Sequence, residues 1–279
     1  MRVDLGTVSL NAIVQGEGST VILLHGFPES SWAWRHQIPA LARRFRVVAP
    51  DLRGYGESDR PAGVDAYRMA HLVDDVERLI RHFGAERAHV VGHDWGGAIA
   101  WAFAALRPRL IDRLVVMNAP HPTHFARRLF RNPRQLLRSW YMLFFQLPRL
   151  PEAFALRDPA RTIARVFRGA AVDRRNFTRE SLAPFVEALA EPGALTAALN
   201  YYRAAGRDMA AGRVVPLPRI DAPTMLVWAR NDVALGNELT VGLEPYVANL
   251  RIEYIPRCGH FVQQEQPDRV TALLDDFLR

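Results

Sequence analysis

The sequence predicts an α/β fold in which a mostly parallel central sheet carries helices on both faces and is interrupted by a helical cap. Two observations predict it. Short runs rich in valine, isoleucine and leucine alternate with stretches of helical spacing over residues 1–121 and again over residues 218–279. Between them, residues 122–217 have the pattern of helices, carry many arginines and contain no clear strand. We therefore divide the chain into a first core segment (1–121), a cap (122–217) and a second core segment (218–279).

Each expected element follows from the spacing of its apolar residues. In the first core segment, strands are expected at residues 8–14, 20–24 and 45–49, in the apolar run that ends before Asp94, and at residues 114–117. Helical spacing there predicts helices at residues 35–43, 70–83 and 95–106. In the second core segment we expect strands at residues 224–228 and 252–255 and helices at residues 238–247 and 268–278. This alternation is typical of a parallel sheet with helices on both faces.

The composition fits one large domain with an insertion. With 279 residues, 49% of them hydrophobic, the chain can bury a substantial core. Its single cysteine, Cys258, excludes an internal disulfide. No apolar signal region follows the N-terminus, and the longest apolar run, residues 98–106, is too short to cross a bilayer. We therefore expect a cytoplasmic protein without an integral membrane segment.

The charge of the chain is positive and unevenly distributed. The net charge is +7, and because the sequence contains no lysine, all 36 basic residues are arginine. Thirteen of them lie between Arg127 and Arg179, against three acidic residues. RNA- and DNA-binding motifs are absent, so we do not expect a nucleic-acid partner. The arginine-rich stretch is expected to form a solvated basic face, with attraction to anionic membrane surfaces as the alternative.

The run GHDWGG, residues 92–97, is the most informative motif. It has the frame G-x-S-x-G of a nucleophile elbow, in which a strand ends, a sharp turn exposes one side chain and a helix begins. Asp94 stands where a serine is usual, and Gly92 and Gly96 supply the small residues that such a turn needs. The alternative is that Asp94 caps the helix that begins near Trp95.

An aspartate at this position narrows the chemistry. A serine that attacked a tetrahedral carbon would form an ether, which water does not cleave, whereas a carboxylate forms an ester that water can hydrolyse. Asp94 therefore indicates substitution at an sp³ carbon that bears a leaving group, and it argues against acyl transfer.

The partners of such a nucleophile are expected at the carboxyl ends of later strands, in the order nucleophile, acid, histidine. Asp232 follows the strand expected at 224–228, and His260 follows the one at 252–255. His260 would deprotonate the water that cleaves the ester, and Asp232 would orient its ring. The alternatives are a turn residue for Asp232 and a structural histidine; Cys258 is expected to pack rather than to attack.

Two backbone N–H groups are candidates for stabilising the oxyanion of ester hydrolysis. One is that of Trp95, at the start of the helix after the nucleophile, and the other is that of Phe27 in HGFP, residues 25–28. The Phe27–Pro28 bond is a candidate cis peptide. The alternatives are a plain turn for this loop and a core aromatic for Trp95.

On these residues together, the chain resembles the epoxide hydrolase branch of the α/β-hydrolase superfamily, which is related to the haloalkane and haloacetate dehalogenases. The resemblance rests on HGFPES (25–30), WRHQIP (34–39), DLRGYGESD (51–59), GHDWGG (92–97) and CGHFVQ (258–263). It implies the α/β-hydrolase fold and a hydrolase that acts on ether bonds. Such an enzyme converts a small apolar epoxide to a vicinal diol through an alkyl-aspartate ester, without metal or cofactor.

The resemblance also implies two cap tyrosines above the nucleophile, and Tyr141 and Tyr202 match that pair. A phenol can hydrogen-bond the ring oxygen of an epoxide and protonate it as the ring opens. The neighbouring Tyr201 and ordinary packing are the alternatives. Phe144 and Phe145 are expected to line an apolar substrate pocket, or else to pack within the cap.

Related enzymes use the same triad on carbon–halogen bonds. Haloalkane dehalogenases share the tryptophan at Trp95 but usually carry asparagine where Phe27 stands. Haloacetate dehalogenases have an arginine after the nucleophile and a tryptophan where Tyr141 falls. Both departures favour an epoxide over a dehalogenase substrate. The further alternative, a non-catalytic ligand-binding relative, would not require the whole set of candidate residues.

If the protein associates, we expect a homodimer.

Overall fold

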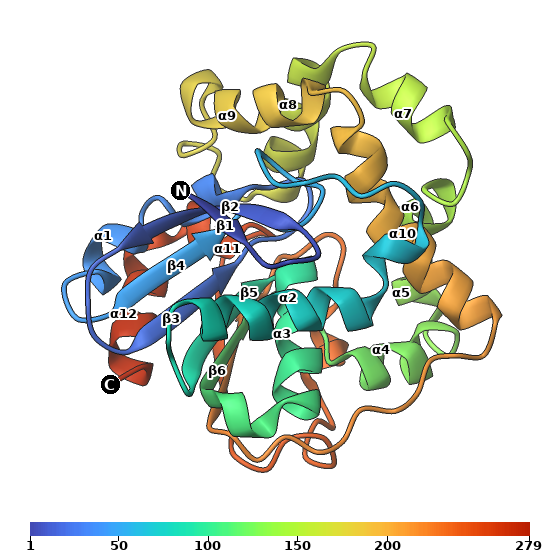
Figure 1. The fold of residues 1–279 in the computed structure, drawn as a ribbon. Helices are drawn as coiled ribbons and strands as arrows, with labels where there is room; N and C mark the ends of the chain where they lie inside the picture. The colour runs from blue at the N-terminus through green and yellow to red at the C-terminus, as the bar shows by residue number, and fades with distance from the viewer.

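The structure, a computed structural model, describes residues 1–279 and contains one central sheet. Its strands are β1 (Arg2–Asp4), β2 (Ser9–Gln15), β3 (Thr20–Leu24), β4 (Arg46–Pro50), β5 (Ala88–His93), β6 (Ile111–Met117), β7 (Thr224–Ala229) and β8 (Leu250–Ile255). They form an eight-stranded sheet in the order β1-β2-β4-β3-β5-β6-β7-β8 (Figure 1). The β1–β2 and β2–β4 pairs are antiparallel, and all the others are parallel. The mostly parallel α/β sheet predicted from the sequence is confirmed.

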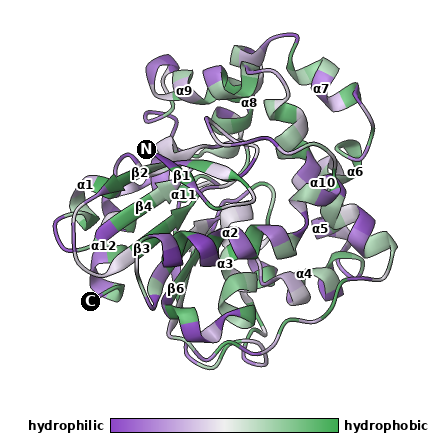
Figure 2. Cartoon of the chain, viewed as in Figure 1, coloured by the Kyte–Doolittle hydropathy of each residue, from purple (hydrophilic) through white to green (hydrophobic).

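Helices cover both faces of the sheet. Successive strand residues point to opposite faces, so in β3 Val21 and Leu23 pack into one hydrophobic core and Ile22 and Leu24 into the other. Because both faces are covered, the strand is fully buried and apolar throughout, and Figure 2 shows the central strands mostly in the hydrophobic colour. The helices on the side of Ile22 are α2 (Met69–His82) and α3 (Trp95–Leu106), and those on the other side are α1 (Ile38–Leu41), α11 (Val262–Glu265) and α12 (Pro267–Phe277).

One helix is shorter than expected, and one strand was not expected. The helix expected at residues 35–43 is shorter, because a 3-10 turn at Ser31–Trp34 precedes it and only Ile38–Leu41 is α-helical. The strand β1 was not expected, because its three residues are too few to show an alternating pattern.

The helix expected at residues 238–247 is wrong. The structure has a single 3-10 turn at Asn237–Thr240, followed by irregular backbone. Gly242 has a φ of +80°, which lies outside the helical region, and Pro245 has no N–H to donate to a helix. Leu243 and Val247 are nevertheless buried, and their spacing imitated a helical period.

Seven helices and no strand lie between β6 and β7, and we call them the helical insertion. They are α4 (Pro122–Leu129), α5 (Pro133–Arg138), α6 (Trp140–Phe144), α7 (Leu150–Ala155), α8 (Pro159–Ala170), α9 (Arg179–Ala190) and α10 (Ala194–Ala210). Figure 1 shows them grouped along one side of the molecule, from α9 at the top to α4 at the lower right. Residues of α10 contribute to both hydrophobic cores, which anchors this helix on the sheet domain.

None of the helices, taken singly, has the length and apolar character needed to cross a membrane. The pair α9 and α10 reaches that length and composition only when the two are counted together, across a bend of 80°.

Candidate active site

The turn between β5 and α3 exposes Asp94. Its backbone has φ 50° and ψ −117°, a conformation that non-glycine residues rarely adopt and that is often found at functional sites. A Cβ atom on Gly92 would lie 2.2 Å from the carbonyl oxygen of Gly96, and one on Gly96 would lie 2.2 Å from that of Leu24. The turn can therefore close only with glycine at both positions.

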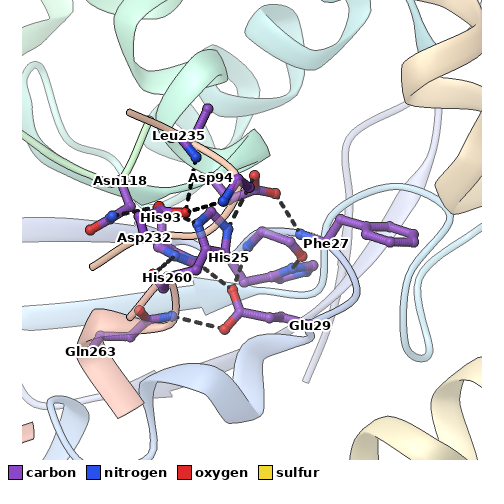
Figure 3. Close-up of polar contacts among 12 residues, drawn as sticks. His25, Phe27, Glu29, His93, Asp94, Asn118, Asp232, Leu235, His260 and Gln263 are labelled. Carbon is purple, nitrogen blue, oxygen red and sulfur yellow. Dashed lines mark hydrogen bonds and ion pairs between the residues drawn. The ribbon is translucent and has the colours of Figure 1, made fainter. Parts of the chain in front are cut away.

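The Asp94 carboxylate lies between two of the predicted partners. Its Oδ1 accepts a hydrogen bond of 2.8 Å from the backbone N–H of Phe27, and its Oδ2 lies 3.5 Å from Nε2 of His260 (Figure 3). Burial alone would raise the pKa of Asp94, but the hydrogen bond and charge of His260 outweigh burial and lower it, so the group is ionised. Its side chain makes no capping bond to α3, so the helix-cap alternative has no support.

His260 and Asp232 form a buried pair beside Asp94. Nδ1 of His260 lies 2.7 Å from Oδ2 of Asp232. Burial alone would lower the pKa of His260, but the charges and hydrogen bonds of Asp232 and Asp94 raise it well above its usual value. The imidazolium therefore shares its proton with one carboxylate and faces a second.

Asn118, which sequence reasoning missed, orients Asp232. Its side-chain amide donates a 2.7 Å hydrogen bond to Oδ2 of Asp232, while the backbone N–H groups of Ala234 and Leu235 donate to Oδ1 at 2.8 and 3.0 Å. With His260, these donors fill the four acceptor positions of the carboxylate. The available signal was a polar residue directly after the apolar strand β6.

A second buried acid–histidine pair, Glu29 and His93, lies beneath the site. Nδ1 of His93 is 2.8 Å from Oε2 of Glu29, and Nε2 is 2.9 Å from the carbonyl oxygen of His260 (Figure 3). Glu29 also accepts bonds from the N–H of Gly26 and from the amides of Gln263 and Gln264.

These donors occupy every acceptor position of Glu29, so the carboxylate has no room for a proton of its own. Burial raises the pKa of Glu29, but the charge and hydrogen bond of His93 outweigh burial and lower it. Both ring nitrogens of His93 thus face oxygen acceptors. The pair connects the loop of Phe27, the elbow and the loop of His260. Sequence analysis assigned it no role, because the two residues are 64 positions apart.

His25 holds the loop that carries the Phe27 N–H. Its Nε2 accepts a 3.0 Å bond from the backbone N–H of Leu52, and its Nδ1 lies 2.9 Å from the carbonyl oxygen of Gly26. The ring is therefore neutral, with the proton on Nδ1, and burial lowers its pKa. The Phe27–Pro28 bond in this loop is cis.

Five aromatic side chains form a wall beside Asp94. The ring of Tyr202 lies 5.0 Å from those of Trp95 and Phe145, 5.4 Å from that of Phe27 and 6.0 Å from that of Tyr141, measured between centroids. Burial and the nearby charge of Asp94 raise the pKa of both tyrosines. Both phenols thus keep their protons at neutral pH.

Tyr201 and Phe144, which adjoin Tyr202 and Phe145 in the sequence, are not part of this wall. The hydroxyl of Tyr201 donates a 2.8 Å hydrogen bond to the carbonyl oxygen of Arg53, so it is already engaged in the core. Phe144 contacts the rings of Phe145 and Trp140 rather than that of Tyr202. Of the two predicted pocket phenylalanines, only Phe145 stands in the aromatic wall.

Other reactive groups do not add to this site. Burial raises the pKa of the Cys258 thiol, which lies 3.6 Å from the carbonyl oxygen of Gly259 and stays protonated. No three histidine, cysteine, aspartate or glutamate side chains are grouped so as to hold a metal ion.

Comparison with known proteins agrees with this geometry. Residues 19–267 match the family model described as alpha/beta hydrolase fold. Epoxide hydrolase 4 of Mus musculus is 37% identical over 93% of this chain and 72% of its own length. Epoxide hydrolase A of Mycobacterium tuberculosis is 35% identical over 99% of this chain and 96% of its own length.

A solved structure extends the similarity to three dimensions. The crystal structure of a Bacillus megaterium epoxide hydrolase in complex with an inhibitor superposes with a TM-score of 0.92 at 30% identity. The match covers 100% of this chain and 99% of that one, so it includes the helical insertion as well as the sheet. The chain therefore belongs to the epoxide hydrolases of the alpha/beta hydrolase fold family.

Proposed function

We propose that the protein hydrolyses a small apolar epoxide to a vicinal diol through a covalent ester on Asp94. The observation that carries the proposal is the position of this carboxylate: ionised, at the apex of the elbow, 2.8 Å from the Phe27 N–H and 3.5 Å from the His260 ring. The names of the relatives in Mus musculus and Mycobacterium tuberculosis support the same activity.

In the first step, Oδ2 of Asp94, the oxygen not held by Phe27, attacks a ring carbon of the epoxide. A carbon–oxygen bond forms to Asp94 and the ring carbon–oxygen bond breaks, leaving its electron pair on the ring oxygen. Tyr141 and Tyr202 donate hydrogen bonds to that oxygen, and one of them gives it a proton. Their raised pKa values keep both phenols protonated until the ring opens.

In the second step, His260 activates a water molecule. Ester formation removes the negative charge of Asp94, one of the two carboxylates that raise the pKa of His260. That pKa therefore falls when the ester forms, and the proton leaves His260 for the tyrosinate produced in the first step, directly or through water. The neutral ring then takes a proton from water as the oxygen attacks the ester carbonyl.

The negative charge of the tetrahedral intermediate develops on Oδ1, where the N–H of Phe27 already donates. We propose the N–H of Trp95, at the start of α3, as the second donor, since the first N–H groups of a helix have no intrahelical acceptor. On collapse, the bond between the acyl carbon and the diol oxygen breaks and His260 returns its proton to that oxygen. His260 then takes the proton of the new carboxyl group, which restores ionised Asp94 with one oxygen from water.

We propose residues 122–217 as the cap of this enzyme and residues 1–121 and 218–279 as its core. The cap contributes Tyr141, Tyr202 and the apolar side chain of Phe145, so the position of the cap defines which epoxides fit. Phe144 supports Phe145 from behind. The cytoplasmic location and the homodimer stay predictions.

A single turnover in water enriched in oxygen-18 tests the covalent step. With enzyme in excess over styrene oxide, the first diol should carry light oxygen from Asp94, and the heavy isotope should appear in the peptide that contains Asp94. A first diol that is fully labelled would instead mean direct attack by water. The Asp94→Ala variant should give neither diol nor labelled peptide.

A further inference from the structure

The outer side of the helical insertion carries large apolar side chains that are open to solvent. Leu137, Trp140 and Leu143 are 74%, 63% and 69% exposed, and their spacing of three residues places them on one face of α5 and α6. The exposed set continues into α7, along the side of the molecule opposite α1 and α12 in Figure 1. We define the apolar stripe as Leu137, Trp140, Leu143, Leu147, Leu150 and Phe154.

Such a stripe is unusual for a protein surface that meets only water. Single exposed apolar residues are ordinary, but six large ones on and between three successive helices indicate a surface that contacts a partner or a lipid. Two residues of the stripe, Trp140 and Leu143, lie on α6, the short helix that also carries Tyr141. Tyr141 and Phe145 stand in the aromatic wall, whereas Trp140 and Leu143 face solvent.

The surroundings of the stripe are strongly positive. Residues 127–179 contain thirteen arginines and three acidic residues. Arg131, Arg134 and Arg157 are exposed and form no ion pair within 4.0 Å. Glu152, an acidic residue of α7, is already paired with Arg203 at 2.7 Å.

A cavity of about 460 Å³ opens beside the stripe. Gln146 and Arg149, which flank Leu147 in the chain, line it together with Arg207 from α10. Arg149 has no ion pair, and the nearest carboxylate to Arg207 is that of Asp65 at 3.9 Å. The carboxylate of Glu152 also lines the cavity, but it is paired with Arg203, so the guanidinium groups of Arg149 and Arg207 are left to meet an anion such as the phosphate of a lipid headgroup.

We propose that this face docks on an anionic lipid bilayer. The apolar stripe would enter the boundary between headgroups and acyl chains, and Arg131, Arg134, Arg149 and Arg157 would meet lipid phosphates. A second copy of the chain is a poorer occupant, because it would bring two arginine-rich surfaces together. Apolar compounds concentrate in lipid, so docking here delivers them to the helix that carries Tyr141.

Vesicle flotation tests the proposal and does not depend on catalysis. The protein should float with vesicles in which a third of the phosphatidylcholine is replaced by phosphatidylglycerol, less at high salt, and far less with phosphatidylcholine alone. The double variant Leu137→Ser/Trp140→Ser should lose this binding. Each arginine near an anionic surface contributes about fivefold, so Arg131→Glu/Arg134→Glu should weaken binding by at least about twenty-fold.

The matched control lies on the core. Leu106 is exposed and Arg109 forms no ion pair, both at the end of α3 away from the insertion, so Leu106→Ser/Arg109→Glu should float like the unmodified protein. Circular dichroism checks that every variant is folded, so binding is judged even if epoxide hydrolysis fails.

Any of three results would overturn the proposal, and the first two come from flotation. They are no flotation with the anionic vesicles at low salt, and equal flotation of the stripe variant and the unmodified protein. The third is a dimer in light scattering that Leu137→Ser/Trp140→Ser converts to monomer without any vesicle binding, which would assign the stripe to a second copy.

Discussion

At Asp94, a carboxylate occupies a turn that the neighbouring glycines force into a rare backbone conformation. The same carboxylate is one of two that hold the proton on His260. One residue therefore has two effects in the proposed mechanism, because forming the ester both captures the substrate and removes a charge from the base.

Replacing the base should trap the covalent intermediate. In His260→Gln, Asp94 loses the imidazolium that lowers its pKa but keeps the hydrogen bond from the Phe27 N–H, so at a pH where it is ionised it should still be alkylated. Hydrolysis of the ester should slow by about 100- to 10,000-fold, the usual contribution of a general base. Intact-protein mass spectrometry should show an increase equal to the mass of the epoxide. Asp94→Asn, which lacks the nucleophile, should show no adduct; an adduct on another residue would exclude Asp94 as the nucleophile.

Removing one phenol should slow the first step. Tyr141→Phe deletes the hydroxyl proposed to protonate the ring oxygen, so alkylation in stopped-flow measurements should slow by roughly 100-fold. Tyr201→Phe is the matched control, since its hydroxyl bonds to the carbonyl oxygen of Arg53. The control should keep the alkylation rate and lose about 1 kcal/mol of unfolding free energy. Equal kinetic effects of the two substitutions would argue against the role of Tyr141.

Acid should separate the two steps. The lowered pKa of Asp94 keeps the nucleophile ionised as the pH falls, whereas hydrolysis needs His260 neutral. Below neutral pH, alkylation should therefore persist while hydrolysis slows, and the ester should accumulate. Rapid quench at successive pH values followed by mass spectrometry measures the esterified fraction. A fraction that decreases as the pH falls would contradict this order of protonation.

Among the elements, the hydrogen bonds of Glu29 and His93 join the loops at the carboxyl ends of β3, β5 and β8. In the helical insertion, Arg203 of α10 has a similar function. It pairs with Glu152 of α7 and donates to the carbonyl oxygens of Phe145 and Leu147, so it fixes the segment that follows Tyr141.

Removing the ion pair of Arg203 and Glu152 should lower the free energy of unfolding. Arg203→Met leaves Glu152 without its partner in a site where both side chains are only 12% exposed, and unfolding in urea should show a loss of about 2–4 kcal/mol. Arg207→Met, at a 58% exposed position 3.9 Å from Asp65, should lose less than about 0.5 kcal/mol. A loss no larger for Arg203 than for Arg207 would mean that the link does not stabilise the fold.

At the scale of the whole molecule, the sheet domain and the helical insertion share their hydrophobic cores. Residues of α10 pack into both cores, and His121, at the junction of β6 with α4, is stacked on Tyr246 at 4.7 Å. His121 is fully buried, and neither ring nitrogen has a hydrogen-bond partner. Protonation of this buried histidine would therefore lower the free energy of unfolding, because neither ring nitrogen has an acceptor.

This histidine should make stability depend on pH. Burial, with a smaller effect of His124, lowers the pKa of His121 from 6.5 to about 4. The unfolded chain binds the proton below pH 6.5 and the folded one does not, so stability should fall from pH 6.5 to about 4, by up to about 3 kcal/mol.

Urea unfolding at several pH values measures this contribution. His121→Phe has no proton to bind, so its stability should fall less between pH 6.5 and 4 than that of the unmodified protein. His82→Phe, at an exposed position of α2, should keep the original slope. If the unfolding free energy of the unmodified protein and of His121→Phe depended equally on pH, His121 would be excluded as the source of the pH dependence.

The spacing of residues along the chain was enough to predict a mostly parallel sheet and the candidates Asp94, Asp232 and His260. These signals are local. The pattern of a strand, a turn and a helix within a dozen residues predicts the elbow, and each candidate partner of Asp94 directly follows its own strand. The helix expected at 238–247 failed for the same reason, because burial from several directions gave irregular backbone a helical spacing of leucine and valine.

The contacts between residues that are far apart in the sequence can be seen only in the folded chain. Glu29 contacts His93, which is 64 residues further along the chain, and Asn118 contacts Asp232, which is 114 residues further. The docking of α10 on the sheet domain engages the hydroxyl of Tyr201 in the core and sets Tyr202 in the aromatic wall. These contacts depend on strand order and on the packing of the insertion, which the spacing of residues along the chain does not encode. The apolar stripe became visible only once burial distinguished the outer face of α6 from its inner face.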